Sequence, residues 1–392
     1  MRRLVIGRRR KGVASGPRCH SRKFCQHSSH SQPTSAERNI CCHSDPTNLL
    51  NCKTKMATQS PSNESISNQT CNMFVYKESA RILFPIFYII VLVVSISGNS
   101  LVLYITSQKK KKFNSTTLYL INLAISDTLF TLALPGRITY YIRGFDWPFG
   151  DLLCRLTAVI FYSNTYTGIA FMTCISADRY LAMVHPHRCL KLRSLKVVRG
   201  ICILVWAIVF LETSPMLFRS MMKEWQGQQT CMEYYNLDES PKTPYVLLFA
   251  CFIGFCLPLG LILGCYSQIN SKLSKMAKEN PMTGKSGKSS RAKNIILLIL
   301  LSFMLCFCPY HVNIMQFMVR RLLHKPSCEE MKSFKMSLQI TVSMMNFNCC
   351  LDPVIYFFAI KTYKQRVMSL FRGYMPASLS SKSVPDNSSS NT

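Results

Sequence analysis

The sequence predicts an all-α membrane protein, a bundle of seven transmembrane helices followed by a short amphipathic helix near the C-terminus. Seven long, nearly uncharged stretches carry this prediction. Each reaches the roughly 20 residues that a helix needs to cross a bilayer core of about 30 Å. Several contain Gly, Pro or Asn, which a bundle accommodates because neighbouring helices satisfy the freed backbone groups. The stretches lie at residues 82–107, 116–142, 153–177, 197–218, 243–270, 294–318 and 337–359.

The chain carries a net charge of +29, and its basic residues cluster in alternate connections between the apolar stretches. Lys109 follows the first stretch, Arg188 the third, Lys275 the fifth and Lys361 the seventh, each with other basic residues nearby. This positive-inside pattern places these connections in the cytoplasm, the N-terminus outside the cell and the C-terminus inside it. A basic chain also suits nucleic acid. The alternation instead indicates a multi-pass plasma-membrane protein that contacts membrane lipid and binds no nucleic acid.

Composition divides the chain into five segments. The N-terminal extension is basic and breaks the positive-inside pattern, so we hypothesise that translation begins at Met56. Its Cys and His residues lack the paired spacing of a zinc site, and no metal site is predicted. The outer tail holds two N-glycosylation acceptors, Asn63 and Asn68. Thr283–Ser290, rich in Gly, Ser and Lys, is predicted to be a flexible loop. The segments are the extension at 1–55, the outer tail at 56–80, the seven-helix domain at 81–360, the amphipathic helix at 361–374 and a Ser-rich, disordered tail at 375–392.

Four cysteines lie on the side that the charge pattern places outside the cell, where oxidising conditions favour disulfides. Cys154 begins the third stretch and Cys231 precedes the fifth, and we predict a disulfide between them. Cys71 precedes the first stretch and Cys328 the seventh, and they form the second predicted pair. Both bonds would close long loops, which constrains the unfolded chain most.

Ionisable residues inside the apolar stretches carry a strong signal, because each costs about 2.5–3.5 kcal/mol at the centre of a membrane helix. Asp127 lies in the second stretch and Asp352 in the seventh. Two interpretations stay open. The acids are a structural hydrogen-bonding hub, or they form, with Asn99, Asn164 and Asn348, a polar core that holds a cation such as sodium and rearranges between states. No base, nucleophile or metal-ligand set accompanies them, so no enzymatic activity is predicted.

Asp178-Arg179-Tyr180 closes the third stretch at its cytoplasmic end. Alone this triplet is a weak motif, because an acid–base pair at a helix end is often a solvated face. Together with motifs in the other stretches it resembles the rhodopsin-like (class A) family of G-protein-coupled receptors, over residues 76–372. The other motifs are Gly98-Asn99, Asn122-Leu-Ala-Ile-Ser-Asp127, Cys154, Trp206, Pro258 with Tyr266, Cys306-Phe-Cys-Pro309 and Asp352-Pro353-Val-Ile-Tyr356.

The resemblance implies a receptor that couples to a heterotrimeric G protein and binds arrestin. It implies that Asp178 holds Arg179 in the inactive state, and that Arg179 meets the Gα C-terminus once the sixth span swings out around Pro309. Two departures concern this switch: Phe307 stands where most members have Trp, and His187 where a bulky aliphatic residue usually enters Gα. The remaining residues that the resemblance assigns to the switch are Tyr180, Tyr266, Asp352, Pro353 and Tyr356, of which Tyr266 and Tyr356 would line the opened cavity.

By the same resemblance, several absences narrow the ligand. Phe161 stands where amine receptors have an anchoring Asp, which excludes biogenic amines. Asn346 stands where an opsin has its retinal lysine. Ile314 stands three positions after His311, where nucleotide receptors have a basic residue. A triphosphate would therefore find few cationic partners.

The candidate ligand-binding residues are Arg137 in the second stretch, Tyr162 and Tyr166 in the third, and Tyr310 in the sixth. Tyr162 and Tyr166 are spaced i, i+4 and share a helix face. One cation and several phenols in an apolar setting suit a small lipid with scattered hydroxyls. Tyrosines also pack and hydrogen-bond internally, and composition supports both interpretations equally.

A narrower resemblance favours the lipid ligand, because several strings are similar to the oxysterol-receptor branch of the family. It implies an oxysterol such as 7α,25-dihydroxycholesterol as agonist, with Arg137, Tyr162, Tyr166 and Tyr310 contacting its hydroxyls. It also implies inhibitory Gα coupling and the guidance of immune-cell migration. The strings are Asn114–Tyr119, Ala133–Tyr141, Gly144–Trp147, Asn164–Tyr166, Thr230–Tyr234, Cys308–His311 and Met345–Cys350.

Other functions are weighed against this one. A chemokine or peptide ligand suits the Cys71–Cys328 pair, although the outer connections offer no large acidic cluster for a basic chemokine. A nucleotide receptor of the same class is a further alternative. A seven-span lipid scramblase or transporter would be expected to show internal repeats, and no repeat relates the two halves of the chain.

Overall fold

The computed structural model describes residues 74–108, 114–186, 189–233, 241–279 and 286–374. These belong to one of the two units of the chain, Asn68–Thr392, whereas the other unit, Met1–Ser67, lies outside the described residues. Several residues named from the sequence also lie outside them: Met56, the glycosylation acceptors Asn63 and Asn68, Cys71, Lys109, His187 and Arg188.

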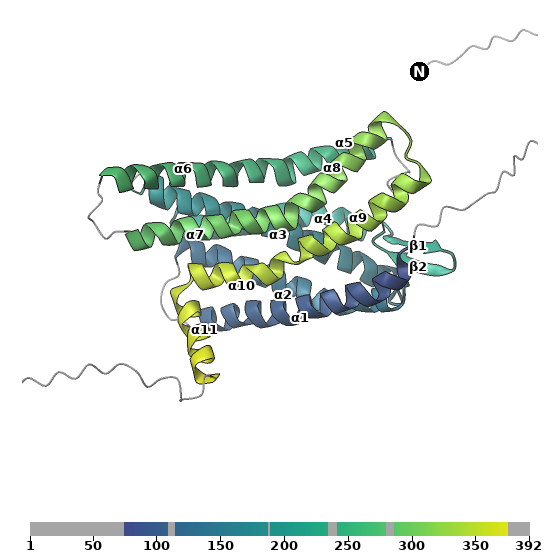
Figure 1. Ribbon diagram of the computed structural model, residues 1–392, viewed down its shortest axis with the longest axis horizontal. Helices are drawn as coiled ribbons and strands as arrows, with labels where there is room; N and C mark the ends of the chain where they lie inside the picture. The colour runs from purple at the N-terminus through teal and green to yellow at the C-terminus, as the bar shows by residue number, and fades with distance from the viewer. Residues whose placement is uncertain (1–73, 109–113, 187–188, 234–240, 280–285, 375–392) are drawn as a thin grey trace, which may run out of the picture. The chain divides into compact units, whose positions relative to one another are not determined.

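The described helices assemble into seven spans arranged as a bundle (Figure 1). The first three are unbroken, the fourth ends in a 3-10 turn, the fifth and sixth each contain a π-helical segment, and the seventh is broken at Phe347. The spans are α1 (Lys77–Ser107); α2 (Ser115–Ile142); α3 (Gly150–Val184); α4 (Leu195–Thr213) with η1 (Ser214–Leu217); α5 (Thr243–Cys251), η3 (Phe252–Cys256) and α6 (Leu257–Glu279); α7 (Ser286–Ser302), η4 (Phe303–Phe307) and α8 (Cys308–Leu323); and α9 (Cys328–Asn346) with α10 (Asn348–Ala359).

The two ends of the bundle differ. One end, the hairpin end, carries β1 (Met222–Trp225) and β2 (Gln228–Cys231), which pair antiparallel with Met222 opposite Cys231. Gln226 and Gly227 join the strands with positive φ angles of 49° and 75°, the conformation of a tight hairpin turn. The opposite end, the α11 end, carries α11 (Lys361–Tyr374). The sequence predicted α11 and not the hairpin.

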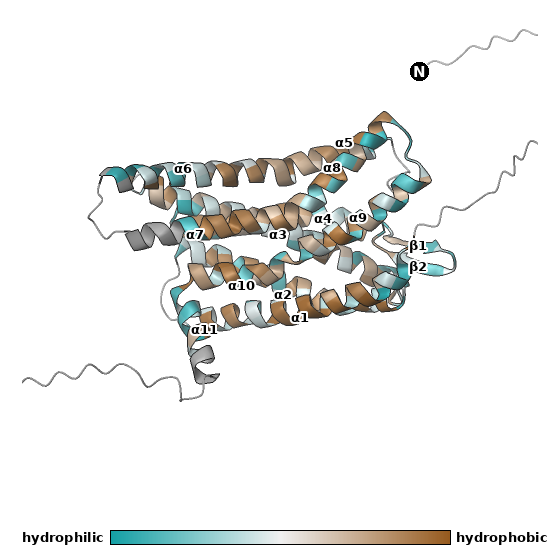
Figure 2. Ribbon diagram, in the orientation of Figure 1, coloured by the Kyte–Doolittle hydropathy of each residue, from teal (hydrophilic) through white to brown (hydrophobic). Residues whose placement is uncertain are grey.

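The residues of the spans are mostly hydrophobic along the middle of the bundle and more hydrophilic toward its ends (Figure 2). Among the described residues, five helical segments are long and apolar enough to cross a membrane, and the bent pair Cys328–Ala359 and Lys361–Ser369 is a sixth candidate. The remaining span, α4, has 19 residues and includes three charged ones, Lys196, Arg199 and Glu212. The predicted all-α fold of seven spans is confirmed.

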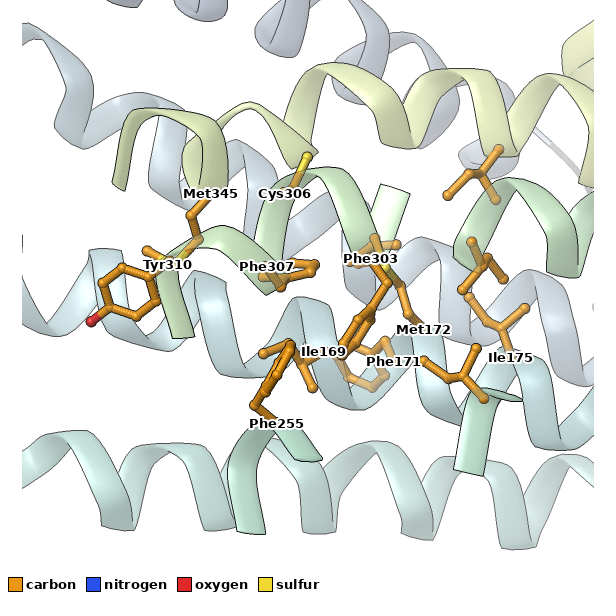
Figure 3. Packing of buried hydrophobic residues seen from close by; sticks show 14 of the residues in the cluster. Ile169, Phe171, Met172, Ile175, Phe255, Phe303, Cys306, Phe307, Tyr310 and Met345 are labelled. Atoms are coloured by element: carbon orange, nitrogen blue, oxygen red, sulfur yellow. The ribbon is translucent and has the colours of Figure 1, made fainter. Parts of the chain in front are cut away.

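Aromatic and aliphatic side chains from α3, η3 and η4 fill the centre of the bundle (Figure 3). The rings of Phe255 and Phe303 stack with centroids 5.6 Å apart, and Phe307 lies 5.3 Å from Phe303. Pro258 and Pro309 each stand at the second residue of the helix that follows a π segment. Proline donates no hydrogen bond and clashes with the preceding turn, so the widened turn accommodates it.

Several helix boundaries differ from the sequence prediction. α1 begins at Lys77 instead of residue 82, and α3 continues to Val184 instead of ending at 177. α7 begins at Ser286, inside the segment predicted to be a flexible loop. Hydropathy marks where the membrane core ends, whereas the backbone hydrogen bonds of a helix continue through polar residues beyond it.

Candidate functional site

Arg137 is the central cation of the site at the hairpin end. Its side chain projects from α2 and is only 3% exposed. Nη1 donates to the backbone carbonyl of Cys231 at 3.2 Å and Nη2 to the hydroxyl of Tyr141 at 3.2 Å. The guanidinium lies over the rings of Tyr140 and Tyr141, 4.8 and 5.0 Å from their centroids. Its Nε–H is buried without a partner among the described residues. One hydrogen-bond donor of the guanidinium is therefore available to a ligand.

A polar network above Arg137 connects α2, α9 and the residues after β2. The Tyr141 hydroxyl donates to Gln339 at 2.6 Å, and the amide of Gln339 donates to Glu233 at 3.1 Å. Glu233 also accepts from Tyr140 at 3.0 Å and lies 4.0 Å from the ammonium of Lys335. Glu233, Gln339 and Lys335 were not predicted from the sequence, because their contacts depend on how the chain after the hairpin folds against the bundle.

Two cavities that share lining residues adjoin this network. The inner pocket, of about 30 Å³, is lined by Arg137, Phe161, Tyr162, Met232 and Tyr310, together with α9 residues. The side cavity, of about 420 Å³, shares Tyr162, Met232 and Tyr310 with the inner pocket and extends toward α4 and α5. The volume of the side cavity falls in the range of roughly 300–1,000 Å³ that small-molecule sites occupy.

All four predicted ligand-binding residues line one or both cavities. Arg137 lines the inner pocket, Tyr166 the side cavity, and Tyr162 and Tyr310 line both. Gly254 makes room for Tyr166, because a Cβ atom at position 254 would lie 3.1 Å from the tyrosine ring. The structure thus places the four side chains around two adjoining cavities, and their contact with a ligand stays a prediction.

His311 adds a polar group that the sequence analysis used only to argue against nucleotides. Its ring stacks on Phe255 with centroids 4.4 Å apart, and Nδ1 lies 2.8 Å from the carbonyl oxygen of Phe307. Because that oxygen can only accept, Nδ1 carries the proton and Nε2 is the acceptor. Nε2 is buried without a hydrogen-bond partner among the described residues. His311 lines the side cavity and could accept a hydrogen bond from a ligand there.

A disulfide fixes β2 above the pockets. Cys154, in the first turns of α3, is bonded to Cys231, the last residue of β2, as predicted. The bond holds the Cys231 carbonyl where it accepts from Arg137. Cys328 is also disulfide-bonded, while its predicted partner Cys71 lies outside the described residues.

Deeper in the bundle, Asp127 and Asp352 belong to a buried polar core. Both side chains are fully buried. Asn164 donates to Asp127 Oδ1 at 2.9 Å. By distance and angle, Asp127 Oδ2, both Asp352 oxygens and Asn348 Nδ2 have no hydrogen-bond partner among the described residues. Two facing carboxyls with so few donors require a proton or a cation between them.

Asn99 links this core to the seventh span. It donates to the backbone carbonyl of Cys349 at 3.1 Å, and its own side-chain oxygen accepts from the Tyr356 hydroxyl at 3.1 Å. Pro353 packs against Gly98, where a Cβ atom would lie only 2.3 Å from the proline ring. The motif residues of the first and seventh spans are therefore in direct contact.

At the α11 end, Asp178 accepts from four donors. The hydroxyls of Ser115 and Thr116 lie 2.5 Å from its carboxylate, Arg193 Nε lies at 2.9 Å and Arg179 Nη2 at 3.0 Å. The carboxylate is 3% exposed, whereas the two arginine side chains are 25% and 20% exposed. The Asp178–Arg179 contact was expected. The other three donors were not, because Arg193 was interpreted only as part of the topology signal.

The remaining switch residues surround this region and the aromatic core. The Tyr180 hydroxyl lies 3.2 Å from His185 Nε2. Tyr266 is half-buried on α6, and Phe307 is fully buried within the aromatic cluster. Pro309 stands where η4 gives way to α8, which makes it a natural point of bending in the sixth span.

Comparisons with known proteins agree with this architecture. The family model described as 7 transmembrane receptor (rhodopsin family) matches residues 98–356. G-protein coupled receptor 183 of Homo sapiens is 49% identical over 333 residues, which cover 84% of this chain and 92% of that protein. The protein of the same name from Bos taurus is 50% identical with the same coverage. Lysophosphatidic acid receptor 6 of Gallus gallus is 35% identical over 279 residues, which cover 69% of this chain and 88% of that protein.

Proposed function

Because the chain belongs to the rhodopsin family of seven-transmembrane receptors, we propose that it is an oxysterol receptor that signals through an inhibitory G protein to direct immune-cell migration. Membership makes it a multi-pass plasma-membrane receptor with G-protein partners, and not an enzyme. The agonist we propose is 7α,25-dihydroxycholesterol or a close analogue. The observation that carries the proposal is Arg137, whose free Nε–H is buried beside a pocket lined mainly by aromatic and apolar side chains.

The chemistry of the two cavities supports a hydroxylated lipid. Arg137 supplies a donor that cannot be deprotonated, and the three phenols of Tyr162, Tyr166 and Tyr310 can donate or accept. Phe161, Met232 and other apolar residues supply the walls. Such a site binds a rigid apolar body and selects it by a few placed hydroxyls. A ligand hydroxyl is a good acceptor for Arg137 and brings no charge into the membrane.

For activation we propose that agonist shifts the receptor from a closed to an open form in proportion to its differential affinity for the two. In the closed form Asp178 holds Arg179. In the open form the sixth span bends at Pro309, and Arg179, Tyr266 and Tyr356 face the G protein. Arrestin would bind at the same end of the bundle. This scheme places the α11 end in the cytoplasm and the hairpin end, with the N-terminus, outside the cell.

The polar core fits a sodium ion, which we propose as part of the closed form. Asp127 and Asp352 would hold it, with Asn164 and Asn348 beside them, because their oxygen atoms include several that lack a partner among the described residues. A bound cation would supply the positive charge that two facing carboxylates require. The Tyr356–Asn99 hydrogen bond would couple that core to the seventh span.

A second ligand class deserves direct comparison because of one relative. The Gallus gallus protein, 35% identical to this chain, is named for lysophosphatidic acid. That ligand carries a phosphate, which would place a dianion beside Arg137 and also beside Glu233, whose carboxylate occupies the same end of the site. A neutral hydroxyl avoids that repulsion, which supports the oxysterol, whereas Lys335 beside Glu233 and Arg219 in the side cavity would attract a phosphate. Competition between the two ligands decides the assignment.

Saturation binding to membranes tests the ligand assignment without relying on signalling. Membranes containing the receptor should bind tritiated 7α,25-dihydroxycholesterol saturably. Unlabelled sterol should displace the label, and lysophosphatidic acid should not. Arg137→Ala should weaken binding by about tenfold or more, since a hydrogen bond to a charged group contributes about 1.5–3 kcal/mol. Arg143→Ala is the matched control, because Arg143 pairs with Asp146 outside the pockets. Equal affinity in wild type and Arg137→Ala would remove Arg137 from the site.

A further inference from the structure

Glu212 is an acidic residue in the last turn of α4, and the mechanism above does not use it. It lines the side cavity together with Tyr162 and Tyr166. Its neighbour Thr213 is buried and hydrogen-bonds to Ser163 of α3 at 3.2 Å. Because Thr213 anchors this turn of α4 against α3, the backbone at Glu212 is held beside the cavity, and the Glu212 side chain is exposed there.

The following segment is held as firmly. Arg155 of α3 donates to the backbone carbonyl of Leu217, the last residue of η1, at 3.0 Å. The chain that directly follows Glu212 is therefore tied to α3 twice, at Thr213 and at Leu217. A carboxylate carried on a fixed stretch of backbone needs less rearrangement to meet a ligand, which favours recognition.

Glu212 has no hydrogen bond or ion pair within the part of the chain that the structure describes. Arg219 lines the same cavity, yet no ion pair joins the two residues there. An ionisable group within a membrane span is costly and usually marks a site of ligand or ion recognition. Asp178 is buried and has four donors, whereas Glu212 is exposed beside the cavity and accessible to a ligand hydroxyl.

The two cavities adjoin at Tyr162, Met232 and Tyr310, which line both. An elongated ligand that contacts Arg137 in the inner pocket can therefore extend past these residues to Glu212. Arg137 only donates hydrogen bonds, whereas an ionised carboxylate only accepts them. The two ends of the site thus differ in polarity and demand different groups from the ligand.

We propose that Glu212 is a specificity-determining residue that accepts a hydrogen bond from a hydroxyl at the end of the ligand remote from Arg137. This inference rests on the proposed function and deepens it, because it defines the ligand as a rigid lipid with hydroxyls at both ends. A sterol that lacks a donor at the remote end leaves the carboxylate unpaired and binds more weakly. The site therefore discriminates against sterols that lack this hydroxyl. Such discrimination is stronger than the discrimination that an apolar pocket achieves by shape alone.

Competition binding with four sterols tests the assignment. The first is 7α,25-dihydroxycholesterol, with hydroxyls at carbons 3, 7 and 25. Each of the other three lacks one donor: no hydroxyl at carbon 7, none at carbon 25, or a ketone in place of the hydroxyl at carbon 3. Each sterol is measured on wild type, Glu212→Ala and Glu212→Gln. The matched control is Glu224→Ala, since Glu224 is an exposed acid of β1 that lines neither cavity.

Glu212→Ala is expected to weaken the binding of 7α,25-dihydroxycholesterol about tenfold or more. Glu212→Gln keeps an acceptor without the charge, so its loss should be smaller. One of the three analogues should bind wild type and Glu212→Ala equally, and this analogue identifies the hydroxyl that Glu212 accepts. Glu224→Ala should match wild type for every sterol.

Two results would overturn the inference: equal affinity of wild type and Glu212→Ala for 7α,25-dihydroxycholesterol, or the same fold-loss for all four sterols. The second result would mean that the variant disturbs the cavity without losing a specific contact. If wild type at normal surface levels binds none of the sterols, the proposed oxysterol function itself fails and the inference falls with it. Failure of the inference alone is recognised by tight wild-type binding that Glu212→Ala leaves unchanged.

Discussion

Replacing Arg193 with alanine removes one of the two cations that hold Asp178 at the α11 end. In the structure Arg193 Nε lies 2.9 Å from the Asp178 carboxylate and Arg179 Nη2 lies 3.0 Å from it. If Arg179 leaves Asp178 on activation, Arg193 keeps the buried carboxylate paired. Without Arg193, the same step leaves the carboxylate with only the hydroxyls of Ser115 and Thr116.

The magnitude follows from the contact that is lost. A hydrogen bond to a charged group contributes about 1.5–3 kcal/mol. Because the Arg193 side chain is 25% exposed, water replaces part of the interaction, and the lower end of that range applies. About 1.4 kcal/mol corresponds to a tenfold change in an equilibrium. Arg193→Ala should therefore lower the ratio of open to closed receptor about tenfold.

The assay is agonist-stimulated nucleotide exchange on an inhibitory G protein, with surface expression matched between variants. Agonist potency should fall about tenfold in Arg193→Ala, while antagonist binding and thermal midpoint stay close to wild type. Arg193→Lys keeps a cation and should recover most of the potency. An unchanged or increased response in Arg193→Ala would refute the reasoning, because it would show that Arg193 does not support the release of Arg179.

Two further predictions concern stability and export. Gly98→Ala should lower the thermal midpoint of the purified receptor by an amount equivalent to about 1–3 kcal/mol, because the added Cβ would lie 2.3 Å from Pro353. Gly264→Ala is the control, because a Cβ at that position would have nothing within 4 Å. Equal midpoints for the two variants would contradict the predicted clash. Cys154→Ser should reduce surface expression, since the bond to Cys231 closes a loop with a sequence separation of 77 and a loop of that length contributes about 4 kcal/mol; normal surface levels would show that the bond is dispensable for export.

Hydropathy and charge were enough to predict the seven spans. A membrane helix must be apolar where it crosses the bilayer, and the basic residues between the helices indicate which connections face the cytoplasm. Helix ends were less accurate. Lys77 and Ser286 begin helices outside the apolar stretches, where backbone hydrogen bonds continue and hydropathy gives no signal. The hairpin was missed because each strand has only four residues and no strong turn dipeptide separates them.

Some residues of the candidate site could likewise be predicted from the sequence, and others could not. Arg137 and the tyrosines could be selected from the sequence, because each is conspicuous in an apolar stretch and resemblance supplied their common position. Glu233 and Gln339 could not, since their hydrogen bond joins residues 106 positions apart in the sequence. Glu212 is different. It lies inside a predicted stretch, and the argument applied to Asp127 would have identified it.

The most direct test of the central claim is inhibitory G-protein activation in cells that express the chain from Met56, titrated with 7α,25-dihydroxycholesterol. The account predicts a saturable response in wild type that is lost or shifted to higher concentration in Arg137→Ala, at equal surface expression. A wild-type receptor present at the surface but silent to this sterol at every concentration would contradict the oxysterol assignment and leave only the receptor fold.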